Sequence, residues 1–154
     1  MAAITVPQIG ETYVGTSPAI VKVARVTVGV SSGSPDVVME ATGAFPIFSV
    51  PAGCLITDFK GRVLEAFTAN VNLNFGDSDD PDGYLAEAAI ASTVCTSDSK
   101  NLLARNVSGY LDSTGKDGGR VYDAAQDILC TVDTAAPAAG KAEVYIFYTE
   151  AGLL

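Results

Sequence analysis

The chain has 154 residues, of which 48% are hydrophobic and 18% charged, and its eighteen acidic and nine basic side chains give a net charge of −9. This length and composition are typical of one globular domain and exclude an intrinsically disordered chain. The acidic balance repels phosphate backbones and anionic lipids, which argues against nucleic acid and membranes as partners.

The chain start, MAAITVPQIGETY, lacks the basic region and the apolar run of a secretion signal. No apolar stretch approaches the roughly 20 residues that a membrane helix needs. We therefore expect a protein that is made and kept in a cytosol. The three cysteines cannot all pair and lack the close doublets of a zinc site, so we predict buried free thiols at Cys54, Cys95 and Cys130.

Residues 1–18 are predicted to form an extended arm, because glycines and prolines interrupt any periodicity there. The first strand is predicted over residues 19–30, where β-branched residues alternate along the chain. Within it Val21 and Val23 are out of phase with the later valines. This predicts either a β-bulge near Ala24 or a segment that is buried on both faces.

Residues 44–50 predict a second strand, and Pro46 inside it favours a sheet edge or a strand break. A tight turn follows, in which Gly53 is free to take a positive φ. Two further strands, 55–68 and 71–75, alternate between apolar and polar residues. Their predicted buried positions are Leu55, Phe59, Val63, Val71, Leu73 and Phe75.

The stretch YLAEAAIASTVC is the one plausible helix, and it is followed by a strand-like segment over residues 101–110. Further strands are predicted over 119–122, 127–132 and 141–149. The last of these is apolar on both faces, which is typical of a strand in the middle of a sheet. Together the pattern predicts an all-β, jelly-roll-like antiparallel β-sandwich over residues 19–154, with an extended N-terminal arm and at most one short helix.

The sequence contains no histidine, which removes the commonest general base and transition-metal ligand. Nucleotide-binding, hydrolase and CxxC motifs are also missing. We therefore predict a protein that is not an enzyme and that needs no cofactor.

The acidic stretch GDSDDPDG, residues 76–83, is predicted to be a turn. Gly76 and Gly83 are expected there at backbone conformations forbidden to residues with a Cβ. An EF-hand register fails, because Ala89 stands where the bidentate glutamate belongs. The alternative is a weak calcium site on Asp77, Asp79 and Asp82.

Residues 50–85, VPAGCLITDFKGRVLEAFTANVNLNFGDSDDPDGYL, resemble small structural proteins of tailed bacteriophages, among them capsid decoration (cement) proteins with jelly-roll folds. The segments RVYDAAQDILCTV and AGKAEVYIFYTE give weaker support. The resemblance implies a homo-oligomer, with a trimer favoured over a dimer, that binds the major capsid protein. It also implies a location on the outer surface of the capsid in the virion, after synthesis in the host cytoplasm.

For this function the expected contact residues lie in the arm and in the last strand: Ile4, Val6, Ile9, Tyr13, Tyr145 and Phe147. The alternative function is a phage fibre or tail-associated module that recognises a host glycan. Such a module needs an exposed aromatic platform, for which the candidates beside loops are Tyr84, Tyr110 and Tyr122.

Overall fold

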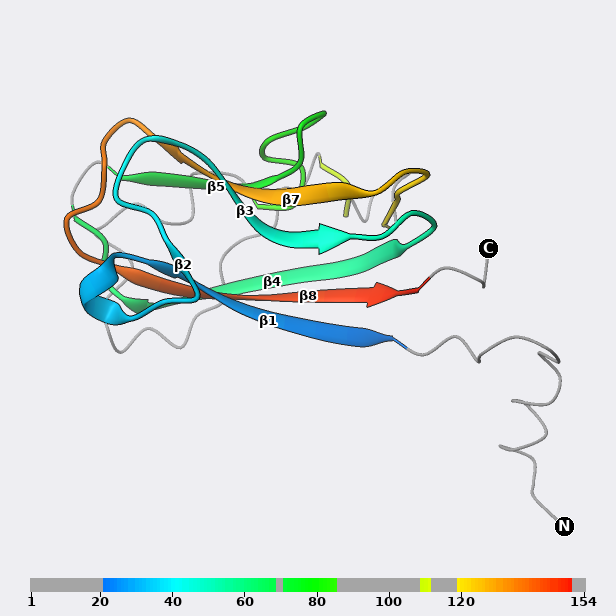
Figure 1. Ribbon diagram of the computed structural model, residues 1–154, viewed down its shortest axis with the longest axis horizontal. Helices are drawn as coiled ribbons and strands as arrows, with labels where there is room; N and C mark the ends of the chain where they lie inside the picture. The colour runs from blue at the N-terminus through cyan, green and yellow to red at the C-terminus, as the bar shows by residue number, and fades with distance from the viewer. Residues whose placement is uncertain (1–20, 69–70, 86–108, 112–118, 151–154) are drawn as a thin grey trace, which may run out of the picture.

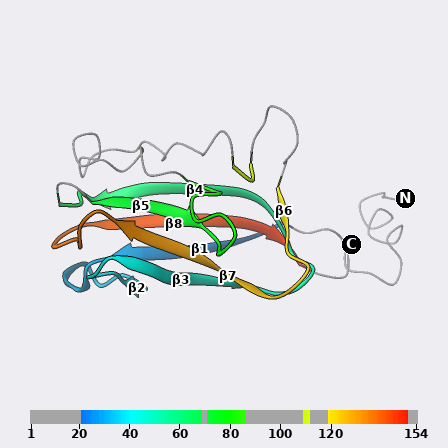
Figure 2. The same ribbon diagram turned by 90° about the horizontal axis from the view of Figure 1, so that it is seen from above.

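The computed structural model describes residues 21–68, 71–85, 109–111 and 119–150, which form two β-sheets packed face to face (Figure 1). The five-stranded sheet has the order β2-β1-β8-β4-β6, and the three-stranded sheet lies over it in the order β3-β7-β5 (Figure 2). No helix within the described ranges has the length and apolar character needed to cross a membrane.

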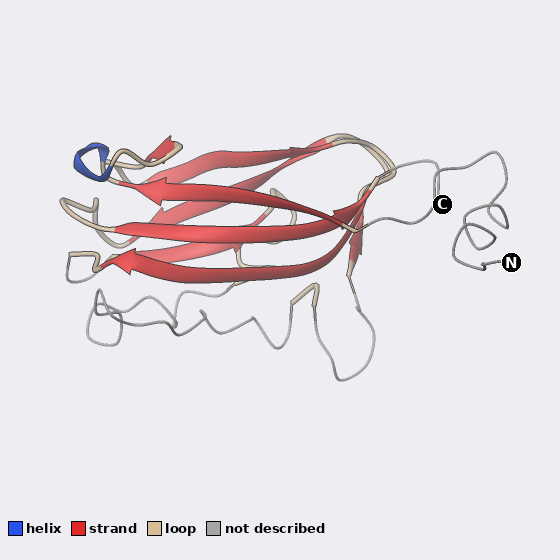
Figure 3. Ribbon diagram, turned by 90° about the horizontal axis from the view of Figure 1, so that it is seen from below, coloured by secondary structure: helices blue, strands red, loops and turns tan. Residues whose placement is uncertain are grey.

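The strands of the five-stranded sheet are β1 (Lys22–Gly29), β2 (Val37–Val38), β4 (Leu55–Glu65), β6 (Arg120–Val121) and β8 (Lys141–Thr149). Those of the three-stranded sheet are β3 (Gly43–Val50), β5 (Asn72–Gly76) and β7 (Gln126–Asp133). A 3-10 turn, η1 (Ser31–Gly33), lies at one end of the five-stranded sheet (Figure 3).

Strand connectivity confirms the predicted all-β sandwich. From β3 to β8, consecutive strands alternate between the two sheets. All neighbouring strands pair antiparallel except β1 and β2, which are parallel. Strand β8 lies between β1 and β4, so its predicted place in the middle of a sheet is also confirmed.

The hydrophobic core lies between the two sheets and is rich in aromatic residues. Phe59 on β4 is fully buried and stacks on Tyr84, with ring centroids 5.1 Å apart and ring planes 13° apart. It also contacts Phe75 on β5 at a centroid distance of 5.6 Å. Such pairs stabilise the contact between the sheets beyond the area that they bury.

Two predicted strand phases are wrong. The pairing of β1 with β8 runs without a bulge from Lys22 to Gly29, and Val21 and Val23 are 51% and 52% exposed, so neither alternative proposed for this segment holds. In β4 the register shifts between Ile56 and Asp58. This shift places Ile56 in the core in place of Leu55, which is half-buried.

Several other local predictions are confirmed. Strand β3, which contains Pro46, is an edge strand with a register shift between Pro46 and Phe48. Gly53 has a φ of 83°. In β5, Leu73 and Phe75 are buried in the core as predicted. The predicted arm, nearly all of the predicted helix and most of residues 101–110 lie outside the described residues.

Candidate functional site

The acidic loop, residues 76–83, is closed by its own backbone. The carbonyl oxygen of Asp80 accepts hydrogen bonds from the N–H groups of Asp77 at 3.0 Å and Gly83 at 3.1 Å. The N–H groups of Tyr84 and Leu85 then bond to the carbonyl oxygen of Phe75, which returns the chain beside β5. The loop is therefore a turn of fixed geometry.

Asp77 organises this turn from within. Its side chain is fully buried. Oδ1 accepts hydrogen bonds from the N–H groups of Asp79 and Asp80 at 2.9 and 3.1 Å and from the hydroxyl of Tyr110 at 2.8 Å. Oδ2 accepts one from the hydroxyl of Tyr122 at 2.7 Å. A buried carboxylate needs such partners, because burial without them is costly.

Three tyrosines and Arg120 complete the cluster. The hydroxyls of Tyr84 and Tyr122 are 2.8 Å apart, and since Tyr122 donates its proton to Asp77, Tyr84 donates to Tyr122. The Arg120 guanidinium lies 4.5 Å from the ring centroid of Tyr110 and 5.3 Å from that of Tyr122. It forms ion pairs with Asp77 at 3.5 Å and Asp79 at 2.6 Å.

The pKa values follow from these contacts. Burial alone would raise the pKa of Asp77, but hydrogen bonds from Tyr122, Tyr110 and two backbone N–H groups outweigh it, so the pKa is lowered. Burial raises the pKa of Tyr84, Tyr110 and Tyr122 well above the ordinary tyrosine range. At neutral pH the cluster therefore holds one carboxylate and three neutral hydroxyl donors.

The three carboxylates of the calcium alternative do not share one position. Asp77 points inward, whereas the side chain of Asp79 is 65% exposed and bonds to Arg120. Within the described part of the chain, which includes Asp82, acidic side chains and cysteines form no group of three or more that would hold a metal ion. A cation on Asp77 would have to displace hydrogen bonds that already satisfy its oxygens.

Two of the three candidate platform tyrosines, and both thiols that the structure describes, also occupy interior positions, whereas Tyr110 is half-buried. Tyr84 and Tyr122 are 0% and 2% exposed. The Tyr122 hydroxyl bonds to Asp77 and the Tyr84 hydroxyl bonds to that of Tyr122, so neither hydroxyl faces the surface. Cys54 and Cys130 are buried and free as predicted, and burial raises the pKa of the Cys130 thiol, while Cys95 lies outside the described residues.

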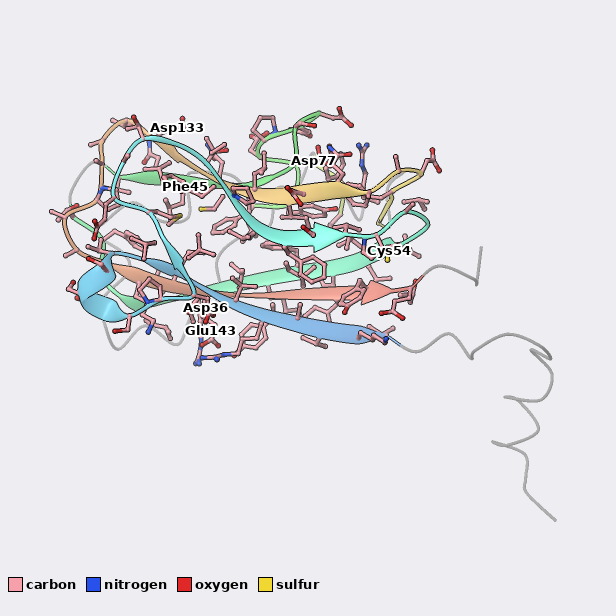
Figure 4. The ribbon with its side chains drawn as sticks, viewed as in Figure 1. Asp36, Phe45, Cys54, Asp77, Asp133 and Glu143 are labelled. Atoms are coloured by element: carbon pink, nitrogen blue, oxygen red, sulfur yellow. The ribbon has the colours of Figure 1, made fainter. Side chains whose placement is uncertain are left out.

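A second charged cluster lies on the face of the five-stranded sheet that points away from the other sheet (Figure 4). Glu143 on β8 is 1% exposed and pairs with Arg25 on β1 at 2.8 Å and Arg62 on β4 at 3.2 Å. The hydroxyl of Tyr145 also donates to it. The hydrogen bond from Arg25, with the attraction of Arg62, lowers the pKa of Glu143 despite its burial.

Next to Glu143, the same face of the sheet carries aromatic, apolar and basic side chains. Phe147 lies between Val23 of β1 and Asp58 of β4 in the strand register, and Tyr145 lies between Arg25 and Lys60. The Lys60 ammonium is 5.6 Å from the centroid of the Phe147 ring. We call this the outer β8 face: Val23, Arg25, Lys60, Tyr145 and Phe147.

The outer β8 face thus unites Tyr145 and Phe147, which were predicted as contact residues, with side chains that were not. The arm candidates Ile4, Val6, Ile9 and Tyr13 lie outside the described residues. Arg120 and Glu143 were missed in the sequence. For Glu143 a signal existed, since a lone carboxylate in the apolar run AEVYIFY requires a cationic neighbour if it is buried.

Neither Gly76 nor Gly83 has a positive φ, so the backbone conformation expected for them is wrong. Gly76 is required because there is no space for a side chain. A Cβ on Gly76 would lie 2.0 Å from the carbonyl oxygen of Asp80 and 2.5 Å from the carbonyl carbon of Pro81. We expect Gly76→Ala to lower the free energy of unfolding by about 1–3 kcal/mol, the usual cost of overpacking, in urea unfolding followed by circular dichroism.

The matched control for this substitution is Gly33→Ala in η1. A Cβ there has its nearest neighbour, a side-chain atom of Lys141, at 3.5 Å. We expect a change within about 0.5 kcal/mol. An equal loss in both variants would show that the crowding at Gly76 does not matter.

No protein-family model and no curated protein sequence matches the chain. Two solved structures contain chains with a similar fold. One chain, in the acidic stable capsid structure of Helicobacter pylori bacteriophage KHP30, has a TM-score of 0.54 and 11% identity over 86% of this chain and 89% of that chain. Another, in the capsid asymmetric unit of cyanophage Pam1, has a TM-score of 0.57 and 18% identity over 97% of this chain and 99% of that chain.

Proposed function

We propose that this chain is a structural protein of a bacteriophage virion that binds the outer surface of an assembled capsid and stabilises it as a decoration, or cement, protein. The observation that carries the proposal is the fold likeness to chains in two phage capsid structures, which in the Pam1 case spans 97% of this chain. Because a shared fold alone does not define a role, the side chains of this protein must also fit the proposed function.

The side chains favour contact over catalysis. Among the described residues, the Asp77 oxygens are occupied by hydrogen bonds, and burial keeps the tyrosine hydroxyls and the Cys130 thiol protonated. Activated nucleophiles and bases have the opposite character, with pKa values near the working pH. The buried clusters therefore fit a role in rigidity, which a protein under load on a shell requires.

The outer β8 face is the surface that we assign to the major capsid protein. It combines half-buried Tyr145 and Phe147 with exposed Val23, and aromatic anchors of this kind dominate the energetics of many interfaces. It also carries two of the nine basic side chains of an acidic chain, Arg25 and Lys60, and Arg62 lies beside it in the Glu143 cluster. The remaining surface is acidic, which suits a position away from packaged DNA.

Sedimentation with mature shells of the phage that encodes the chain tests this function. We expect the protein to co-sediment with shells but not with free capsid subunits, and electron microscopy to show added density on the outer surface. Phe147→Ser should weaken binding to shells at least tenfold, about 1.4 kcal/mol, because it removes the aromatic anchor.

The matched control is Leu129→Ser on β7, a half-buried side chain on the outward side of the three-stranded sheet. This variant should bind shells as the unaltered protein does. Failure of the unaltered protein to bind shells would refute the proposed function. Equal binding by the two serine variants would refute only the assigned face.

A further inference from the structure

The first half of β1 is an open sheet edge among the described strands. On the side away from β8, β2 pairs with β1 only at Val28 and Gly29 (Figure 1). The next residue back, Thr27, donates its backbone N–H to the Asp36 carboxylate at 2.8 Å. Described strands therefore leave Lys22–Val26 without a partner on this side.

The backbone groups that face this edge belong to Val23 and Arg25. The N–H of Thr27 bonds to Asp36 and the carbonyl oxygen of Gly29 accepts from the N–H of Met39 at 2.8 Å, so both point away from β8. Alternate residues of an antiparallel strand direct their N–H and C=O groups to the same side. Val23 and Arg25 therefore present two donors and two acceptors for another strand.

Other described edges are interrupted. Strand β3 contains Pro46 and a register shift, and β4 has two register shifts along its pairing with β8. On β5, Phe75 is already bridged to Leu85. Such irregularities are devices that prevent edge-to-edge pairing. The regular pairing of β1 with β8 leaves its edge without any of them.

The side chains at the β1 edge also favour pairing with another strand. Val21 and Val23 are 51% and 52% exposed. Free lysines often protect an exposed edge, but here the Lys22 ammonium pairs with Glu150 at 2.7 Å and the Arg25 guanidinium with Glu143 at 2.8 Å. The edge is thus apolar, and both of its cations are neutralised within the sheet.

We propose that the β1 edge, Lys22–Val26, accepts an extended strand from the N-terminal segment of a second copy of this chain. Residues 1–20 contain a single charged side chain, Glu11, in a chain of net charge −9. This segment therefore adds little charge repulsion when it approaches a second, acidic copy of the chain. Ile4 and Val6 alternate with Thr5 as in a strand, and Pro7 ends the run.

The length of the segment allows it to reach a second copy. At about 3.3 Å per residue, twenty extended residues span up to about 66 Å. A strand given by one copy to the next is a heterologous contact, which closes into a ring when the rotation allows. The inference deepens the proposed function, because such a ring is the trimer expected of the decoration protein.

Val23→Pro tests the edge directly. Proline removes the N–H that faces the open side and leaves the bonds to β8, which use the residues on either side of Val23. Sedimentation velocity of the full chain should show self-association weakened at least tenfold, with circular dichroism unchanged. Val23→Thr keeps the N–H and the side-chain shape, so it should self-associate nearly as the unaltered protein does.

A crosslinking experiment identifies the occupant and does not depend on the proline variant. In a Cys95→Ser background, Ile4→Cys protein is mixed with affinity-tagged Val23→Cys protein and treated with a bismaleimide. We expect a covalent pair that contains both variants. Val121→Cys, at a site that is 45% exposed on β6, replaces Val23→Cys as the control and should give none.

Two results would overturn the inference: unchanged self-association of Val23→Pro, or the absence of a covalent pair between Ile4→Cys protein and Val23→Cys protein. Neither result would touch the binding of the protein to shells. Conversely, a protein that exchanges strands but ignores shells would refute the proposed function and leave the β1 edge in place.

Discussion

Replacement of Asp77 with alanine is expected to lower the free energy of unfolding by about 3–5 kcal/mol, the range observed when one partner of a buried ion pair is removed. The carboxylate accepts four hydrogen bonds and is fully buried. Its loss leaves the hydroxyls of Tyr110 and Tyr122 without an acceptor. It also leaves the Arg120 guanidinium, held between those two rings, without its buried partner.

Urea unfolding at pH 7 followed by circular dichroism measures this loss, and Asp79→Ala is the control. Asp79 bonds to the same Arg120 at 2.6 Å, but its side chain is 65% exposed. Exposed ion pairs contribute little, so we expect a loss below about 1 kcal/mol. If Asp79→Ala cost as much as Asp77→Ala, the surface pair and not the buried cluster would hold the loop.

Alternation along the sequence was sufficient to predict most of the sandwich. In β5 the apolar residues follow a period of two, and in β7 only Leu129 departs from it, since each strand has one face on the core. Strand β8 carries aromatic residues on its outward side as well as apolar residues on its core side, and it lies between two neighbours. These properties are local, and the sheet geometry that they reflect is the same in every β-sandwich.

The predicted alternation of buried and exposed residues was wrong where a strand is irregular and where an apolar side chain is exposed. The register shift after Ile56 reverses the alternation of β4, and no residue in that stretch marks it. Val23 is apolar and exposed, so a pattern that equates apolar with buried assigns it wrongly. An exposed apolar side chain at an edge is better explained by a partner than by the core.

The acidic loop was predictable as a turn but not as a cluster. Asp, Pro and Gly define the turn within eight consecutive residues. In contrast, the partners of Asp77 are Tyr110 and Tyr122, which lie 33 and 45 positions further along the chain. Likewise Glu143 and Arg25 are 118 positions apart. Only the strand order brings such residues together, and the strand order cannot be read from composition or spacing.

Both buried carboxylates, Asp77 and Glu143, tie the stability of the sandwich to pH. They lie in different layers, Asp77 at the end of β5 and Glu143 on the outward side of β8 (Figure 4). Each has a lowered pKa in the folded state, so folding favours the charged form. The pKa of Asp80 shifts in the opposite direction, because burial and its hydrogen bond with Asp82 raise it.

The sign of the pH dependence follows. Stability from Asp77 and Glu143 is complete above their unfolded pKa values, about 3.9 for Asp and about 4.3 for Glu, and is lost as the pH falls through the lower folded values. The contribution of Asp80 is complete below its unfolded pKa and is lost as the pH rises, so it offsets part of the change. We expect the free energy of unfolding to be nearly constant from pH 7 to about pH 5 and to fall steeply below about pH 4.

Urea unfolding at a series of pH values checks this profile, with circular dichroism as the probe because the chain has no tryptophan. Glu143→Gln should be less stable at pH 7, since Arg25 and Arg62 lose their shared partner. The same variant should lose less stability between pH 5 and pH 2, because one of the carboxylates with a lowered folded pKa is gone. A parallel profile for Glu143→Gln and the unaltered protein would mean that the outward cluster on β8 contributes nothing to acid sensitivity. The steep fall would then belong to the other carboxylates with a lowered pKa, which are Asp77, Asp36 and Glu40.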